Sequence, residues 1–144
     1  MVDKSKGDLR VEEKQVKQLL LDITEAIRNQ NLDDYLKGFH REVIVLAPQT
    51  PIIRGVENWR KFLEKVFQYI VSINYDEILV RLSESGDCGY CVANYKAVEN
   101  PPGGWTDAQE RLHCTVVKDG GVWKIVAFSW NVEWKKVDVN RRGS

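Results

Sequence analysis

The stretch TDAQERLHCTVVKDGGVWKIVAFSWNVEW, residues 106–134, decides the fold of this chain. Two β-rich runs, Thr106–Val117 and Val122–Trp134, lie on either side of the turn sequence Asp119-Gly120-Gly121. Glycines after an aspartate supply the positive φ angles that a tight hairpin turn requires. The stretch therefore predicts an antiparallel hairpin near the end of the chain.

Two further β-rich runs, Ile73–Leu82 and Gly89–Val98, precede this hairpin. The segments 83–87 and 100–104 separate the runs with the Gly, Pro and Asp residues that are typical of turns. Consecutive hairpins are the simplest topology for four such runs. A shorter β-rich run, Val43–Leu46, lies further upstream and ends before two prolines.

Three amphipathic helices are predicted before the four long strands. The first begins after Asp8 and runs to about Asn29, the second is capped by Asn31, and the third follows Arg54-Gly55. Each has apolar residues at the helical period: Val16, Leu19, Leu20, Ile23 and Ile27; then Leu32, Tyr35, Leu36 and Phe39; then Trp59, Phe62, Leu63, Val66, Phe67 and Ile70. Helices followed by hairpins predict an α+β fold, with three N-terminal helices against a curved antiparallel sheet.

Length and composition indicate one globular domain. The chain has 144 residues, of which 43% are hydrophobic and 29% charged, so it can bury a core and is not disordered. We expect a flexible tail over residues 1–7, the domain over residues 8–134, and a second flexible tail over residues 135–144.

Charge and cysteine content bound the partners and the compartment. The 21 basic and 21 acidic side chains balance, which disfavours a nucleic-acid partner. No apolar run reaches the length of a membrane span, and the N-terminus lacks the apolar segment of a signal peptide. Three cysteines cannot all pair, which favours reduced thiols. We therefore expect a cytoplasmic protein without nucleic-acid or membrane partners.

The last predicted strand is apolar on both faces. Trp123, Ile125 and Ala127 would lie on one face, whereas Val126, Phe128 and Trp130 would lie on the other. The helices can cover one face, and a second copy of the chain could cover the other. This pattern predicts a homodimer through the outer face of the sheet. The alternative is a β-bulge that exchanges the two faces midway along the strand.

Several segments together resemble the nuclear transport factor 2-like superfamily. They are QNLDDY at residues 30–35, Phe39, VIVLAP at residues 43–48, Arg54-Gly55 before the aromatic helix, and DGGVWKIV at residues 119–126 followed by Trp130. The last segment is similar to the SnoaL-like and ketosteroid-isomerase-like branch, and the layout is also similar to the association domain of calmodulin-dependent kinases. The resemblance implies a cone-shaped domain with an internal cavity, which some members use for catalysis and others for binding or assembly.

The resemblance also implies where an isomerase would carry its catalytic groups. The carboxylate base falls on Ala47, the tyrosine that stabilises the oxyanion falls on Ile23, and a protonated carboxylic acid falls near His113. An isomerase of this type needs a group that moves the proton and donors that hold the enolate. Because the base and one donor are missing, an intact isomerase site is not expected.

His113 is the main catalytic candidate, as an acid or base in a mostly apolar cavity. The alternative is a histidine that is satisfied by a neighbouring strand or faces a dimer partner. Tyr35, Trp59, Phe128 and Trp130 are candidates for the wall of a ligand cavity, although aromatic residues at such spacing also form ordinary cores.

The cysteines predict neither a redox nor a metal site. Cys88 and Cys91 have redox spacing, but a strand follows them and not the helix that activates such a thiol. His113 and Cys114 are neighbours on a strand, so their side chains diverge. No cofactor is expected either.

The sequence therefore favours a homodimeric domain that binds a small apolar molecule or serves in association. The first alternative is a small-molecule enzyme, a cyclase, dehydratase or isomerase, with His113 as acid or base. The second alternative is a module for protein assembly.

Overall fold

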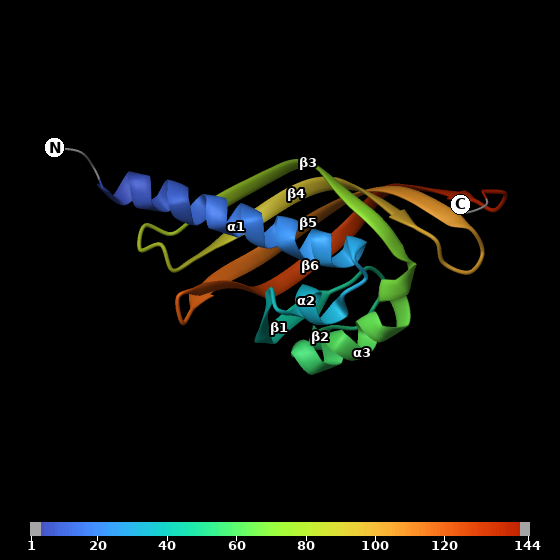
Figure 1. Ribbon diagram of the computed structural model, residues 1–144, viewed down its shortest axis with the longest axis horizontal. Coiled ribbons are helices and arrows are strands. Elements are labelled where there is room, and N and C mark those ends of the chain that lie inside the picture. The colour runs from blue at the N-terminus through green and yellow to red at the C-terminus, as the bar shows by residue number, and fades with distance from the viewer. Residues whose placement is uncertain (1–3, 142–144) are drawn as a thin grey trace.

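The computed structural model describes residues 4–141, and the side chains of residues 8–141. Its elements in chain order are α1 (Lys4–Arg28), α2 (Leu32–Leu36), β1 (Phe39–Leu46), β2 (Ile53–Arg54), α3 (Val56–Val66), the 3₁₀ turn η1 (Phe67–Tyr69), β3 (Ile70–Leu82), β4 (Cys88–Glu99), β5 (Trp105–Asp119) and β6 (Val122–Asp138). The predicted α+β fold, with three helices packed against a curved sheet, is confirmed (Figure 1).

The six strands form one open sheet in the order β2-β1-β6-β5-β4-β3. Strands β3 to β6 pair antiparallel through consecutive hairpins, as their turn sequences predict. The short strand β1 differs, because it pairs parallel to β6 and antiparallel to the two-residue strand β2. The sheet is therefore mostly, but not wholly, antiparallel.

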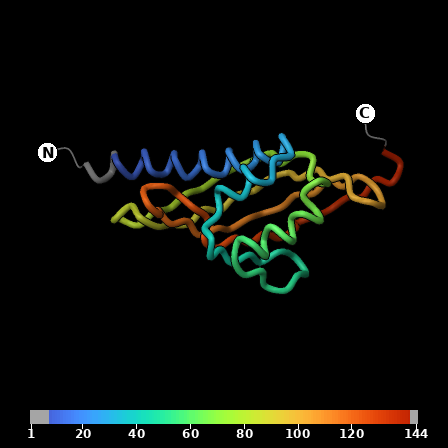
Figure 2. Tube along the Cα trace, turned by 60° about the horizontal axis from the view of Figure 1, so that its bottom comes forward, coloured from blue at the N-terminus to red at the C-terminus, as the bar shows by residue number. Residues whose placement is uncertain are grey.

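The helices cover one side of this sheet. Helix α1 runs along the sheet and packs against β3, whereas α2 and α3 gather with β1 and β2 at one end (Figures 1 and 2). The predicted cap of α2 is present, since the Asn31 side-chain oxygen accepts a hydrogen bond from the backbone N–H of Asp34 at 3.0 Å. The inner stripes of α1 and α3 are buried, with Leu20 at 0% and Trp59 at 1% exposure.

Both ends of the domain extend further than predicted. Helix α1 begins at Lys4, before the expected cap Asp8. Backbone hydrogen bonds of a helix form with polar residues just as they do with apolar residues, so the helix can extend beyond its apolar stripe. Strand β6 continues to Asp138 although its last residues are exposed and polar, because their backbone pairs with residues 105–110 of β5. Residues 1–3 and 142–144 of the expected tails lie outside the described residues.

A β-bulge at Val126 rearranges the faces of β6. Val116 pairs with Ile125 and Thr115 pairs with Ala127, so Val126 is an extra residue without a partner on β5. As a result Ile125 and Phe128 are both buried on the inner face. The alternative interpretation of this strand is therefore correct, and the doubly apolar pattern no longer requires a second subunit to cover it.

Candidate functional site

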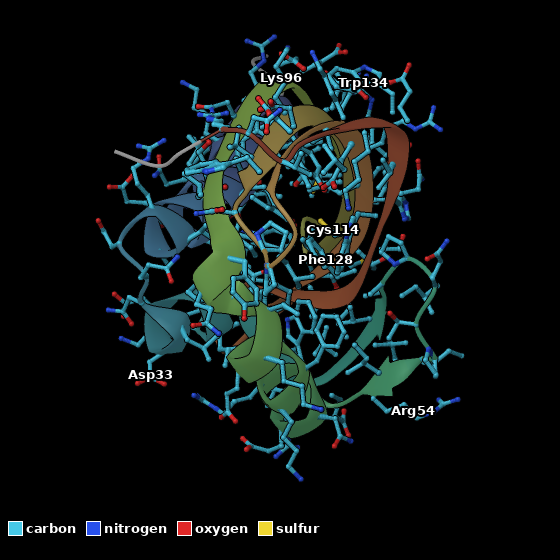
Figure 3. The ribbon with its side chains drawn as sticks, turned by 90° about the vertical axis from the view of Figure 1, so that its right-hand side faces the viewer. Asp33, Arg54, Lys96, Cys114, Phe128 and Trp134 are labelled. Carbon is cyan, nitrogen blue, oxygen red and sulfur yellow. The ribbon has the colours of Figure 1, made fainter. Side chains whose placement is uncertain are left out.

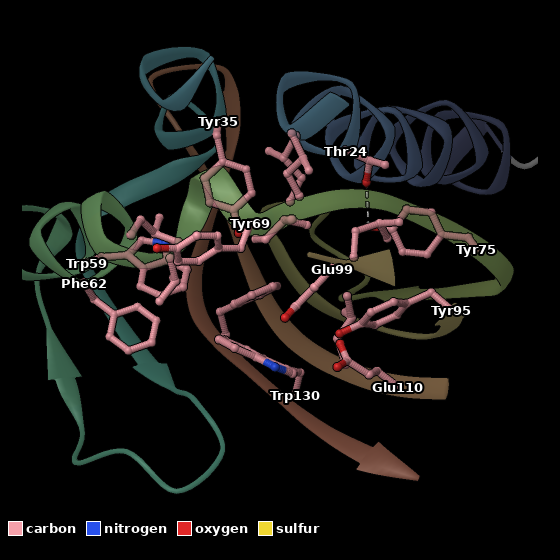
Figure 4. Close-up of a pocket in the computed structure, with 18 of the residues that line it drawn as sticks. Thr24, Tyr35, Trp59, Phe62, Tyr69, Tyr75, Tyr95, Glu99, Glu110 and Trp130 are labelled. Carbon is pink, nitrogen blue, oxygen red and sulfur yellow. Dashed lines mark hydrogen bonds between the residues drawn. The ribbon is translucent and has the colours of Figure 1, made fainter. Parts of the chain in front are cut away.

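A cavity of about 270 Å³ lies between the helices and the inner face of the sheet (Figure 4). Its wall is mostly apolar and includes eight aromatic side chains, namely Tyr35, Trp59, Phe62, Tyr69, Tyr75, Tyr95, Phe128 and Trp130. Helices α1 and α3 contribute Ile23, Thr24, Ile27, Leu63 and Val66, and the sheet contributes Ile70, Ile73, Leu112 and the two carboxyl groups of Glu99 and Glu110.

Trp59 of α3 holds the aromatic wall together. Its ring centroid lies 6.4 Å from that of Tyr35, 6.3 Å from that of Phe128 and 6.1 Å from that of Trp130. These four residues are the predicted ligand contacts, and all four line the cavity. Among the described residues, the indole N–H of Trp59 is the buried side-chain polar group without a hydrogen-bond partner. A buried donor of this kind can bond to a polar atom of a ligand.

Side chains along β4 and β5 alternate between the two faces of the sheet, and this alternation places the carboxyl groups of Glu99 and Glu110 on the inner face. Tyr95 and Glu99 share the inner face of β4, and Tyr95 lies directly opposite Glu110 in the register of β4 and β5. Glu110 is only 8% exposed. Its carboxyl group lies next to the phenol of Tyr95 in Figure 4.

Burial perturbs the ionisation of these groups. Desolvation raises the pKa of Glu110, the neighbouring phenol of Tyr95 opposes this change, and the charge of Glu99 adds to it. Desolvation also raises the pKa of Glu99. The pKa of Tyr95 is raised as well, by burial and then by the charge of Glu110. Such perturbed carboxyl groups within a cavity are characteristic of functional sites.

Tyr75 and Thr24 place two hydroxyl groups in the wall. Their hydroxyl groups are hydrogen-bonded at 3.0 Å between β3 and α1 (Figure 4). Burial raises the pKa of Tyr75 to about 12. Tyr75 is therefore a neutral hydrogen-bonding group at physiological pH.

The carboxyl groups also border a second hollow, which is lined by Pro48, Gln49, Glu99, Glu110, Trp130, Asn131, Val132 and Lys135. Glu99, Glu110 and Trp130 belong to both walls. The opposite charge of Lys135 lowers the pKa of both carboxyl groups, but this effect is smaller than that of burial. These three shared residues therefore mark the boundary between the cavity and the second hollow.

His113 does not lie where the sequence interpretation expects it. The residue is exposed and faces away from the cavity, whereas its neighbours Leu112 and Cys114 are buried on the inner face. The imidazole lies against Tyr90 on the outer face, with 5.8 Å between the ring centroids. Because successive residues of a strand point to opposite faces, the inward position of Leu112 turns His113 outward.

Glu99 and Glu110 are functional candidates that sequence reasoning missed. A signal was present, because Glu110, Leu112, Cys114 and Val116 alternate at period two, which places Glu110 on the apolar face of its strand. Of the positions that the resemblance assigns, Ile23 lines the cavity, and Ala47 is buried outside its wall.

The three cysteines lie in different environments. Cys88 is exposed, whereas Cys91 and Cys114 are buried opposite each other on β4 and β5. Figure 3 shows Cys114 and Phe128 within the curve of the sheet. Within residues 4–141, no three His, Cys, Asp or Glu side chains gather as metal ligands. None of the helices in this range is both long and apolar enough to cross a membrane.

An open curved sheet with three helices on its inner side defines a cone-shaped α+β domain of the nuclear transport factor 2-like type. The chain belongs to the SnoaL-like domain family, whose pattern matches residues 16–130. No sequence of a curated protein matches this chain at a significant level.

Several solved structures share the fold over nearly the whole chain. A candidate scytalone dehydratase from Novosphingobium aromaticivorans has 16% identity and a TM-score of 0.80, with 94% of this chain and 93% of that chain covered. The hexachlorocyclohexane dehydrochlorinase LinA-type3 from Novosphingobium barchaimii has 9% identity and a TM-score of 0.80, with 99% of both chains covered. A ketosteroid isomerase-like protein from Erwinia carotovora has 14% identity and a TM-score of 0.73, with 85% of this chain and 97% of that chain covered. At these identities the similarity shows the fold alone.

Proposed function

We propose that this protein binds a small, mainly apolar molecule in the cavity beneath α1 and α3. The observation that carries the proposal is the cavity of about 270 Å³, whose aromatic wall surrounds two carboxyl groups. Pockets for small molecules combine apolar walls with a few polar groups in this way. We also expect the protein to act in the cytoplasm, because its three cysteines cannot all pair.

Binding can be measured through the fluorescence of Trp59 and Trp130, which both line the cavity, and through the thermal stabilisation that small hydrophobic compounds produce. Leu112→Phe should fill part of the cavity and reduce both signals. His113→Ala is the matched control from the outer face of the same strand, and it should bind as the parent does. Equal loss of binding in both variants, or no binding by the parent, would contradict the proposal.

A second candidate function is acid–base catalysis by Glu110. The observation that favours it is the buried carboxyl group of Glu110 beside the phenol of Tyr95, since a carboxyl group of raised pKa can take a proton from carbon and return it. Three of the similar structures are named as a dehydratase, a dehydrochlorinase and an isomerase-like protein. In this second candidate function Glu110 is the acid or base, the role for which the sequence favoured His113.

The catalytic version predicts exchange of acidic C–H groups with solvent. We expect the protein to accelerate deuterium incorporation at the α-carbon of 1-tetralone, followed by NMR, and Glu110→Gln to remove the acceleration. His113→Ala should keep it. If 1-tetralone binds without accelerated exchange, the binding function stands and the catalytic version fails.

We further propose that the protein is a homodimer through the outer face of the sheet. This face exposes Leu79, Tyr90 and Trp134, at 39%, 46% and 49%. Large apolar side chains exposed on one face favour association. Sedimentation should give twice the monomer mass, and Tyr90→Lys together with Leu79→Lys should give the monomer mass. If the parent sediments as a monomer at all concentrations, the homodimer is contradicted. The exposed face would then favour the alternative of a module that binds a different protein.

A further inference from the structure

We propose that the molecule bound in this cavity carries a positively charged amino group, which is held by Glu110 with Glu99 beside it. Its apolar body then packs against the aromatic wall around Trp59. This inference rests on the proposed binding function and names the chemical class of the ligand.

The charged groups of the cavity wall favour a ligand with a positive charge. Glu99 and Glu110 are its ionisable acids, and none of its lining residues is Lys, Arg or His. Lys135 is the basic group whose charge acts on both of them, and it is exposed in the second hollow. A carboxylate or phosphate ligand would therefore meet two like charges in a wall of low polarity, where such repulsion is strong.

The carboxyl groups lack a cationic partner from the protein. Within residues 8–141 neither Glu99 nor Glu110 forms an ion pair, although Glu12, Asp33, Asp34 and Asp76 do. The phenol of Tyr95 offers Glu110 one neutral donor only. Burial of a carboxylate without a counter-charge costs free energy. The ammonium group of a ligand would provide the positive charge that the cavity wall lacks.

The aromatic part of the wall agrees with this assignment. The π faces of aromatic rings attract cations, and eight aromatic side chains line the cavity. Aromatic rings with buried acids form a more specific surface for an amine than a purely apolar wall.

Three probes of almost identical shape separate the classes: 2-naphthylmethylamine, 2-naphthylmethanol and 2-naphthoate. Their dissociation constants for the full-length protein can be measured at neutral pH by calorimetry. We expect the amine to bind at least about tenfold more tightly than the alcohol, and the acid to bind most weakly. In Glu110→Gln the preference of the amine over the alcohol should shrink to less than about threefold.

Glu133→Gln provides the matched control, because Glu133 is exposed and belongs to neither wall. It should keep the preference for the amine, and circular dichroism should show that both variants fold. Equal affinities for the three probes, tighter binding of the acid, or an undiminished preference in Glu110→Gln would overturn the inference while the binding function stands. If no probe binds and none stabilises the protein, the proposed function fails together with the inference.

Discussion

Tyr95 and Glu110 lie directly opposite each other on the inner faces of β4 and β5, so a phenol is the nearest neutral partner of a buried carboxyl group. Cross-strand neighbours of this kind are close enough to change each other's ionisation. Burial outweighs the phenol here, because the net effect is a raised pKa for Glu110. The ionised carboxylate is therefore disfavoured in the folded protein.

This relationship predicts that Glu110→Gln stabilises the protein at neutral pH, by about 1 kcal/mol. A carboxyl group whose pKa is raised on folding contributes stability below its unfolded value, near 4.5, and loses it as the pH rises through the folded value. Urea unfolding at several pH values between 4 and 8 should show that the advantage of the variant grows with pH. An advantage that is largest at pH 4 would show that the carboxyl group is not destabilised by burial.

Glu12 should behave in the opposite way. Its carboxylate accepts hydrogen bonds from Lys118, at 2.7 Å, and from Trp123, and these two bonds lower its pKa. Glu12→Gln is expected to lose about 1–2 kcal/mol of unfolding free energy at pH 7, since bonds to a charged group are lost. The contribution is present above pH 4.5 and is lost as the pH falls through the lowered folded value.

Glu13→Gln is the control for Glu12, because Glu13 neighbours it on α1 and forms none of the ion pairs of the described residues. Denaturant titrations at pH 7 and pH 3 should show a larger difference between the two variants at pH 7 than at pH 3. Equal stability of both variants at pH 7 would mean that the contacts of Glu12 with β5 and β6 contribute little.

The three cysteines should differ in reactivity. Cys88 is exposed, whereas Cys91 and Cys114 are buried and their thiols are hydrogen-bonded to each other. The contact with Cys91 and then burial raise the pKa of Cys114, which keeps the thiol protonated and unreactive. Mass spectrometry after brief treatment with a maleimide should show one modification in the native protein and three after unfolding. Rapid modification of Cys114 in the folded state would contradict this burial.

Deletion of Val126 tests the bulge that turns the end of β6 inward. Without the extra residue, Ile125, Ala127 and Phe128 would alternate regularly, with Ile125 and Phe128 still on the inner face. We therefore expect this deletion to lose less than about 1 kcal/mol of unfolding free energy, because no core side chain changes face. Deletion of Lys124 keeps the bulge but turns Trp123 to the outer face, and it should lose about 3–5 kcal/mol, comparable to removing a large core side chain. Unfolding in urea measures both, and a Val126 deletion as damaging as the Lys124 deletion would contradict this account of the bulge.

The kinds and the order of the elements follow from the sequence alone, because helical and strand periods are properties of neighbouring residues. The stripe of Val16, Leu20 and Ile23, the cap at Asn31 and the turn at Gly120-Gly121 all act over a few positions, and the structure places them as predicted. Four of the eight aromatic residues of the cavity wall, Tyr35, Trp59, Phe128 and Trp130, also follow from such patterns, since large apolar side chains on inner faces have few other places to lie.

Tertiary structure alone decided which polar groups reach the cavity. The apolar alternation of β5 places Glu110 on the face of Leu112 and Cys114 and His113 on the opposite face, but only the packing of the sheet against the helices turns the face of Glu110 toward a cavity. The bulge at Val126 and the parallel pairing of β1 with β6 depend on residues far apart in the chain. Pairing between residues far apart in the chain has no local signature in the sequence. The polar groups that the fold encloses are the carboxyl groups of Glu99 and Glu110, whereas His113, which the sequence favoured, lies on the outer face.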